Sequence, residues 1–162
     1  MCMMKETISE LSKGMIIGHK SRAKLISQLM DALEEMQVDE ETVKTLVEKV
    51  FFRAGAEDSK DYEGDDPDDF IRFMTRINME VFDKEIIKTD KDHSVVRFHY
   101  CPLHAAWCEM GLPPERIKYL CDVAGRSDYG RASNFKNIKF EMTKRLAAGD
   151  PYCELDAKRI TE

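Results

Sequence analysis

Side chains that can bind a metal ion or transfer a proton are concentrated between His99 and Cys153. This stretch holds four of the five cysteines, two of the four histidines and the single tryptophan. Its thiols, imidazoles and carboxylates are, in order, His99, Cys101, His104, Cys108, Cys121, Asp122, Asp128, Asp150 and Cys153. We therefore expect the functional site in this stretch, with the preceding half of the chain as its support.

The cysteines also occupy positions that suit small buried hydrophobic residues. Cys101 and Cys108 share one face of a short expected helix, and Cys121 lies in the apolar stripe of the next helix. Cys153 alternates in phase with Leu155 on an expected strand. Because a thiol packs well in such places, one interpretation is that these cysteines only fill the core.

A second interpretation is that the same cysteines bind a metal ion. Cys101 and His104 are three residues apart, so that one helical turn could present both to an ion. Cys121 and Cys153 would complete a ligand set suited to zinc or to an iron–sulfur cluster. The sequence contains no Cys-x-x-Cys pair that would make this a known zinc or cluster motif.

A catalytic thiol is the third interpretation of the same residues. Cys101 stands where an expected strand turns into a helix, and free backbone N–H groups at a helix start stabilise a thiolate. Either His99 or His104 is near enough in sequence to act as its base.

Two carboxylates could take part in proton transfer. Asp122 follows Cys121 near the end of an apolar stripe, so a half-solvated carboxylate there could orient a histidine or activate water. Asp150 lies in the sequence Gly-Asp-Pro, where a turn and a functional site explain it equally well. We expect Asp128 to be a loop residue.

Composition restricts the class of protein and its partners. A net charge of −6 disfavours a nucleic-acid binder, which needs a basic face. No apolar run approaches the roughly 20 residues that span a bilayer, and the N-terminus lacks the apolar segment of a signal peptide. We therefore expect a cytoplasmic protein that binds neither nucleic acid nor membranes.

Its cysteines should be reduced or metal-bound, and Cys2 should be unpaired. The ten methionines and apolar N-terminal helices are compatible with a homodimer.

Hydrophobic periodicity predicts an α+β protein. N-terminal helices should pack on a small antiparallel sheet of about four strands, with a helical insertion between the strand pairs. Residues 1–162 should form a single domain, with helical support in 1–80 and the sheet plus the cysteine-rich site in 81–162. We expect helices at 7–36, 39–55, 67–79, 101–110 and 113–124, and strands near 82–88, 96–100, 138–142 and 153–157. The acidic segment 57–69 should be a solvated loop, and segment 125–133 should be a loop or a short helix.

Several short motifs occur in an order that resembles the L-2-amino-thiazoline-4-carboxylic acid hydrolase family. They are Cys101-Pro102-Leu103, Gly111-Leu112-Pro113, Cys121-Asp122, Thr143, and Gly149-Asp150 followed by Cys153. The resemblance covers roughly the last 65 residues. It implies a hydrolase that opens the thiazoline ring of an amino-acid-like small molecule and yields a carbamoyl-cysteine.

Such chemistry needs a base for the attacking water, an acid for the leaving atom and a clamp for the substrate carboxylate. Asp122 or Asp150 could be the base, with help from His104 or Cys101. The clamp could be Arg97, Arg126 or Arg131, since a guanidinium matches a carboxylate with two hydrogen bonds, and the resemblance adds Thr143 to the substrate site. Cys101, Cys121 and Cys153 would hold a metal or line the pocket.

Two other functions fit the same residues. One is a non-enzymatic module whose cysteines bind a metal, an iron–sulfur cluster or a small ligand. The other is a scaffold whose cysteines belong only to the core. All three functions depend on whether thiols that are distant in sequence meet around one pocket.

Overall fold

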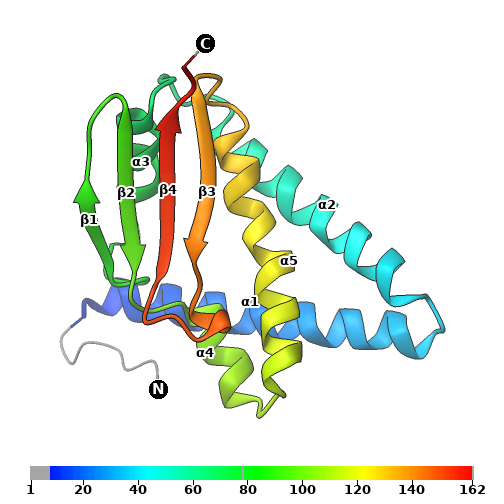
Figure 1. Cartoon of the computed structure of the whole chain (residues 1–162). Helices are drawn as coiled ribbons and strands as arrows, with labels where there is room; N and C mark the ends of the chain where they lie inside the picture. Colours follow the sequence, from blue (N-terminus) through cyan, green and yellow to red (C-terminus); the bar gives the residue numbers. More distant parts are fainter. Residues whose placement is uncertain (1–7, 78, 162) are drawn as a thin grey trace.

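The computed structural model describes residues 8–77 and 79–161, so Cys2 and the predicted helix start at Thr7 lie outside the described part. Five helices, one 3₁₀ turn and a four-stranded antiparallel sheet confirm the α+β prediction (Figure 1). The elements are α1 (Glu10–Glu35), α2 (Glu40–Ser59), α3 (Pro67–Thr75), β1 (Lys84–Lys88), β2 (His93–Phe98), α4 (Pro102–Glu109), α5 (Pro114–Ala132), β3 (Ile138–Lys144), η1 (Leu146–Ala148) and β4 (Cys153–Arg159). Within the described ranges, no helix is long and apolar enough to cross a membrane.

Polar side chains begin the first three helices. Ser9 accepts a hydrogen bond from the N–H of Ser12, and Asp39 accepts one from the N–H of Thr42 at 2.9 Å. Asp66 begins α3 with a reciprocal capping box. Each side-chain oxygen satisfies an N–H group that has no partner inside the helix, so the local sequence alone sets these helix starts.

The sheet brings the two ends of the expected site together. Its strand order is β1-β2-β4-β3, and every neighbouring pair is antiparallel. In the ladder between β2 and β4, Val96 faces Leu155 and Phe98 faces Cys153. Cys153 is therefore held at the end of β2, a few residues before Cys101, although 52 positions separate the two thiols in the sequence.

Helices α2 and α5 pack so closely that their backbones touch. A Cβ atom built on Gly55 would lie 1.9 Å from the carbonyl oxygen of Ser127, and one on Gly130 would lie 2.0 Å from that of Phe52. Only glycine permits this approach, so Gly55 lies inside α2 and does not end it as predicted. Helix α2 continues into the expected acidic loop as far as Ser59. Likewise, α5 continues through the expected polar segment to Ala132.

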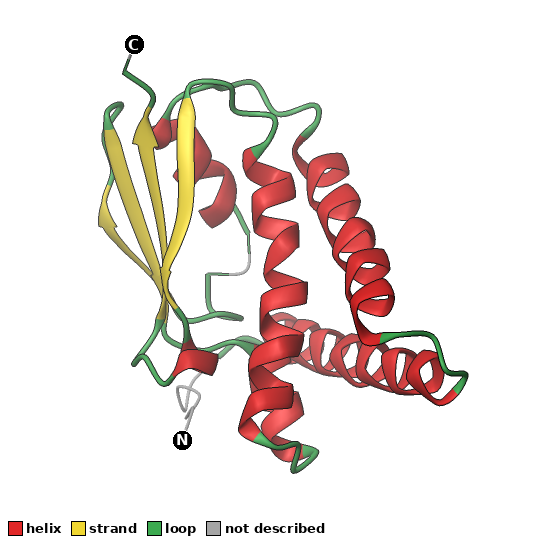
Figure 2. Cartoon of the chain, turned by 45° about the vertical axis from the view of Figure 1, so that its right-hand side comes forward, coloured by secondary structure: helices red, strands yellow, loops and turns green. Residues whose placement is uncertain are grey.

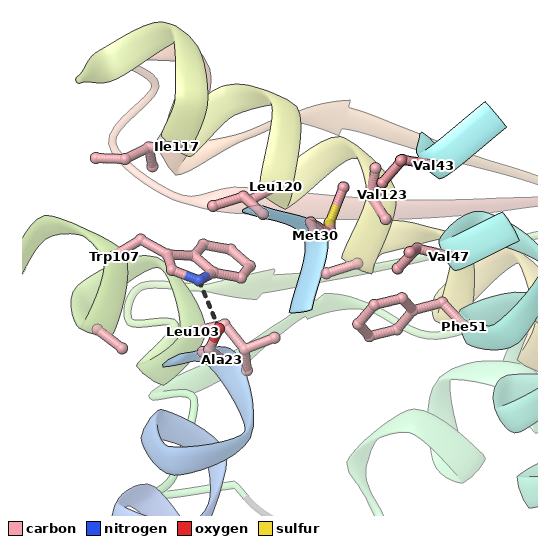
Figure 3. Packing of buried hydrophobic residues seen from close by; sticks show 12 residues of the cluster. Ala23, Met30, Val43, Val47, Phe51, Leu103, Trp107, Ile117, Leu120 and Val123 are labelled. Carbon is pink, nitrogen blue, oxygen red and sulfur yellow. Dashed lines mark hydrogen bonds between the residues drawn. The ribbon is translucent and has the colours of Figure 1, made fainter. Parts of the chain in front are cut away.

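The main hydrophobic cluster lies between the helices. Trp107 is fully buried there, and its indole N–H donates to the carbonyl oxygen of Ala23 at 2.9 Å (Figure 3). Around it pack Met30, Val43, Phe51, Leu103, Leu120 and Val123. Helices α1 and α2 thus pack mainly on α4 and α5, while α3 and α5 contact the sheet (Figure 2).

Candidate functional site

A cavity of about 180 Å³ lies where α1, α2, α4 and α5 meet the sheet. Apolar side chains such as Leu103, Trp107 and Met142 form part of its wall. Titratable side chains form much of the rest, namely His19, Arg22, Asp58, Arg76, Lys84, Cys101, His104, Cys121, Asp128, Arg131, Arg145 and Cys153. The cavity thus combines a largely apolar wall with a cluster of titratable side chains.

Three thiols that are distant in sequence meet at this cavity, as the sequence analysis required. Cys101 precedes α4, Cys121 lies on α5 and Cys153 begins β4; all three are partly buried and line the wall. The Sγ of Cys153 accepts a hydrogen bond from the N–H of Leu146 at 3.4 Å. These cysteines therefore lie at the border between the hydrophobic clusters and the cavity, whereas Cys108 is exposed on α4.

The environment keeps these thiols protonated. Desolvation raises the pKa of Cys101 to about 12, although the N–H groups of Leu103 and His104 act in the opposite direction. Desolvation and the neighbouring thiols also raise the pKa of Cys121. A protonated thiol is a weak nucleophile and a weak metal ligand. In the described part of the chain, no three Cys, His, Asp or Glu side chains are grouped closely enough to hold an ion, so the predicted zinc or iron–sulfur site at Cys101, Cys121 and Cys153 finds no support.

Asp128 is one of the two carboxylates that line the cavity. It lies on the cavity-facing side of α5, at helical spacing from Cys121, and only 16% of its side chain is exposed. Its Oδ1 accepts a hydrogen bond from Nη1 of Arg131 at 2.8 Å. Desolvation nevertheless raises the pKa of Asp128 above its usual value. The expectation that Asp128 is a loop residue is wrong, because α5 does not end near Ala124.

A second cavity carboxylate, Asp58, is held by two arginines. Its Oδ2 accepts from Nε of Arg131 at 2.8 Å, and its Oδ1 accepts from Nη2 of Arg76 at 2.9 Å. Arg131 therefore bridges Asp58 on α2 and Asp128 on α5. Of the three arginines expected to clamp a substrate carboxylate, Arg131 is the one that lines the cavity.

Asp122 and Asp150, the two expected bases, lie outside the cavity lining. Asp122 pairs with Arg145 and accepts from Nζ of Lys118 at 3.3 Å. Asp150 accepts from the backbone N–H of Arg145 at 2.8 Å, which closes the turn between β3 and β4. The turn thus accounts for Asp150, while Asp122 reaches the cavity only through its ion pair with Arg145.

The remaining expected substrate contacts also lie elsewhere. Arg97 donates to Glu154 at 2.8 Å, and Thr143 donates to the same carboxylate at 2.8 Å, which forms a polar patch on the sheet. The guanidinium carbon of Arg126 lies 5.0 Å from the centre of the Tyr129 ring. None of the three lines the cavity.

Lys84 and His104 are basic groups of the cavity wall whose pKa is lowered. Desolvation lowers the pKa of Lys84 to about 8, and its Nζ donates to the carbonyl oxygens of Met74 and Ile77 at 2.6 and 3.1 Å. His104, expected from the sequence, lines the cavity, and desolvation lowers its pKa as well. Lys84 is therefore a cation that can release its proton near neutral pH, and His104 is a neutral imidazole.

The N-terminal half contributes to the site directly. His19 and Arg22 lie one turn apart on α1, and Nη2 of Arg22 is 3.0 Å from Nδ1 of His19. Desolvation and the charge of Arg22 lower the pKa of His19 to about 4. Sequence reasoning missed this pair because nothing in α1 marks it. The spacing of Asp128 and Arg131 from Cys121 was a usable signal, since residues 121, 124, 125, 128 and 131 share one helix face.

Fold and cavity together define an α+β protein with a small site enclosed by helices and one end of the sheet. This chain belongs to the L-2-amino-thiazoline-4-carboxylic acid hydrolase family, whose sequence model matches residues 18–156. The match includes every residue of the cavity lining, from His19 to Cys153. The resemblance seen in the last 65 residues therefore extends through the N-terminal helices.

Among solved structures, the fold is similar to that of a trafficking protein particle complex subunit 3 from Naegleria fowleri, covalently bound to palmitic acid. The two share 15% sequence identity with a TM-score of 0.58, over 90% of this chain and 96% of the other. At this identity the likeness establishes the fold alone. A comparison with curated proteins found no match.

Proposed function

We propose that this protein hydrolyses L-2-amino-thiazoline-4-carboxylate, or a closely related cyclic amidine carboxylate, inside the cavity. The observation that carries the proposal is the position of Asp128, a partly buried carboxylate with a raised pKa on the wall of a small cavity within the family-matched segment. Carboxylates of this kind are typical general bases. Family membership supplies the substrate class. The cytoplasmic location expected from the sequence is part of this proposal.

In the proposed reaction, water attacks the ring carbon that lies between nitrogen and sulfur. Asp128 accepts a proton from the water as its oxygen bonds to that carbon. The tetrahedral intermediate then collapses, and one ring bond breaks, either carbon–sulfur or carbon–nitrogen. The leaving atom takes up a proton, so that water is added in full and the product is a carbamoyl-cysteine.

Lys84 is the proposed acid for the leaving atom. With a pKa of about 8, Lys84 is protonated at neutral pH. This pKa is also close to that of a departing alkyl thiol, so the proton can pass between them. Arg131 would position Asp128 through the bond that it already makes. Cys101, Cys121 and His104 would contact the ring as neutral groups of the wall.

A second candidate is the binding of an acyl chain, because the trafficking subunit of the same fold is covalently bound to palmitic acid and Cys101 faces this cavity. Asp58, Asp128 and Arg131 line the same space. Packing an alkyl chain against charged groups would cost several kcal/mol for groups that lose their hydration. The cavity therefore favours a small polar substrate.

The test is incubation of the purified protein with L-2-amino-thiazoline-4-carboxylate, with carbamoyl-cysteine measured by mass spectrometry. We expect turnover that falls roughly 100-fold or more in Asp128→Asn, as for loss of a general base. Glu115→Gln, at an exposed carboxylate in the first turn of the same helix and outside the cavity lining, is the matched control. Cys101→Ala should lose less than about tenfold, because a protonated wall thiol is not the nucleophile.

Two results would contradict the proposal. One is undiminished turnover in Asp128→Asn with circular dichroism unchanged. The other is an inactive wild-type protein whose intact mass shows an acyl group that disappears in Cys101→Ala, which would establish the second candidate.

A further inference from the structure

The cavity wall carries a surplus of positive charge. Its lining includes five cationic side chains, Arg22, Arg76, Lys84, Arg131 and Arg145, but only two acidic ones, Asp58 and Asp128. The chain as a whole has a net charge of −6, so this concentration of cations runs against the overall composition. A local surplus of this sign attracts an anion.

Most of these cations already have partners. Arg76 and Arg131 donate to Asp58 at 2.9 and 2.8 Å, Arg131 also donates to Asp128, and Arg145 pairs with Asp122. The ammonium group of Lys84 is held by two backbone carbonyl oxygens.

Arg22 differs from the others. Its guanidinium contacts Nδ1 of His19 at 3.0 Å, and within residues 8–77 and 79–161 it makes no ion pair with a carboxylate. Desolvation and the charge of Arg131 lower the pKa of Arg22. The side chain nevertheless remains accessible to solvent, so a ligand can reach it. Arg22 is thus a cation in surroundings that disfavour its charge, and a bound anion would relieve this.

His19 holds the guanidinium in place. Arginine can only donate hydrogen bonds, so Nδ1 of His19 must be the unprotonated acceptor nitrogen. The lowered pKa of His19, about 4, agrees with this neutral form. His19 therefore uses one N–H donor of Arg22 and leaves the others available to a ligand.

We propose that Arg22 binds the carboxylate of the substrate and thereby sets the preference of the cavity for ring compounds that carry one. This inference rests on the proposed function for the identity of the substrate. A planar guanidinium fixes both oxygens of a carboxylate, so it would orient the ring as well as hold it. With Arg22 on α1 and Asp128 on α5, the substrate would lie between the two helices.

The experiment compares two ligands, L-2-amino-thiazoline-4-carboxylate and 2-amino-2-thiazoline, which lacks the carboxylate. Binding to the full chain is measured by calorimetry and turnover by mass spectrometry. The variants are Arg22→Gln, Arg22→Lys and the control Arg53→Gln, an exposed arginine of α2 outside the cavity lining.

We expect wild type and Arg53→Gln to bind the carboxylate compound roughly 10- to 100-fold more tightly than its analogue, the range for a hydrogen bond between charged groups. Arg22→Gln should lose this difference, because its affinity falls for the carboxylate compound alone. Arg22→Lys should keep part of the difference. Equal weakening of both ligands in Arg22→Gln would indicate a structural role and overturn the inference, as would an unchanged preference.

The two proposals fail in different ways. If the wild-type protein binds the carboxylate compound through Arg22 but releases no product, the hydrolase proposal fails and the inference stands. If wild type and Arg22→Gln turn over both compounds alike, the inference fails and the hydrolase proposal stands. If the wild type binds neither compound, both are overturned.

Discussion

Helix α5 separates two regions with opposite chemistry. On one side, Leu120 and Val123 pack into the cluster around Trp107, where the polar indole N–H is satisfied by the carbonyl oxygen of Ala23. On the other side, Asp128 and Arg131 face a cavity whose groups have displaced pKa values. The two regions meet at Leu103 and Trp107, which also line the cavity, but the charged groups lie in the second region. The helix thus assigns stability to one face and chemistry to the other, residue by residue.

This division predicts that the two faces respond differently to substitution. A change in the cluster should lower the free energy of unfolding, and a change in the cavity should alter binding, turnover or pH dependence at little cost in stability.

Leu120→Ala should lower the free energy of unfolding by about 2–5 kcal/mol, the usual cost of truncating a buried leucine in a packed core. Leu120 is fully buried in the cluster around Trp107 and lies outside the cavity lining. Urea denaturation followed by circular dichroism measures the change. Arg22→Gln serves as the cavity counterpart and should cost less than about 1 kcal/mol. Equal losses in the two variants would break the division between core and cavity.

The pH dependence of turnover should report directly on the ionisation of Lys84 in the cavity. Lys84 must be protonated to supply the leaving atom, so kcat/KM should fall about tenfold per pH unit above a pH near 8. Lys84→Arg keeps the charge but cannot release a proton between pH 6 and 10, so it should lose most of the turnover and the alkaline limb with it. Rate profiles for both proteins, between pH 6 and 10, are the measurement. An alkaline limb that stays in place in the variant would remove Lys84 from the reaction.

The smallest expected effect is on the free energy of unfolding of the protein at acid pH. The pKa of His19 is about 4 in the folded protein and about 6.5 in the unfolded chain, so the unfolded chain binds more protons between these values. Stability due to this group is therefore complete above pH 6.5 and is lost as pH falls toward 4. His19→Gln should unfold with a flatter pH dependence over this window than wild type. Parallel curves would show that His19 is accessible to protons in the folded state.

Local sequence was sufficient for much of the fold. Asp39 and Asp66 marked helix starts because a short polar side chain can satisfy free N–H groups, and alternating residues marked β2 and β4. The expected meeting of Cys101, Cys121 and Cys153 at one pocket is confirmed.

Two features of the site depend on contacts between distant segments and were missed for that reason. The polar composition of segment 125–133 predicts a loop or a short helix, and Gly125, Ser127 and Gly130 are indeed weak helix formers. Packing of α5 against α2, which requires Gly130, outweighs this local preference. Arg22 and His19 form no motif, and only the position of α1 beside α4 brings them to the cavity.

The pairing of Phe98 with Cys153 between β2 and β4 limits how this site can change. Side chains on a strand point alternately to its two faces, so a shift of a single position in β4 would turn Cys153 away from the helices. Insertions in the tight connection that contains η1 would therefore be tolerated only in forms that preserve this pairing, and Leu146 and Ala147 of that connection also line the cavity. The length of this loop is in this way constrained by the alignment of an interior wall.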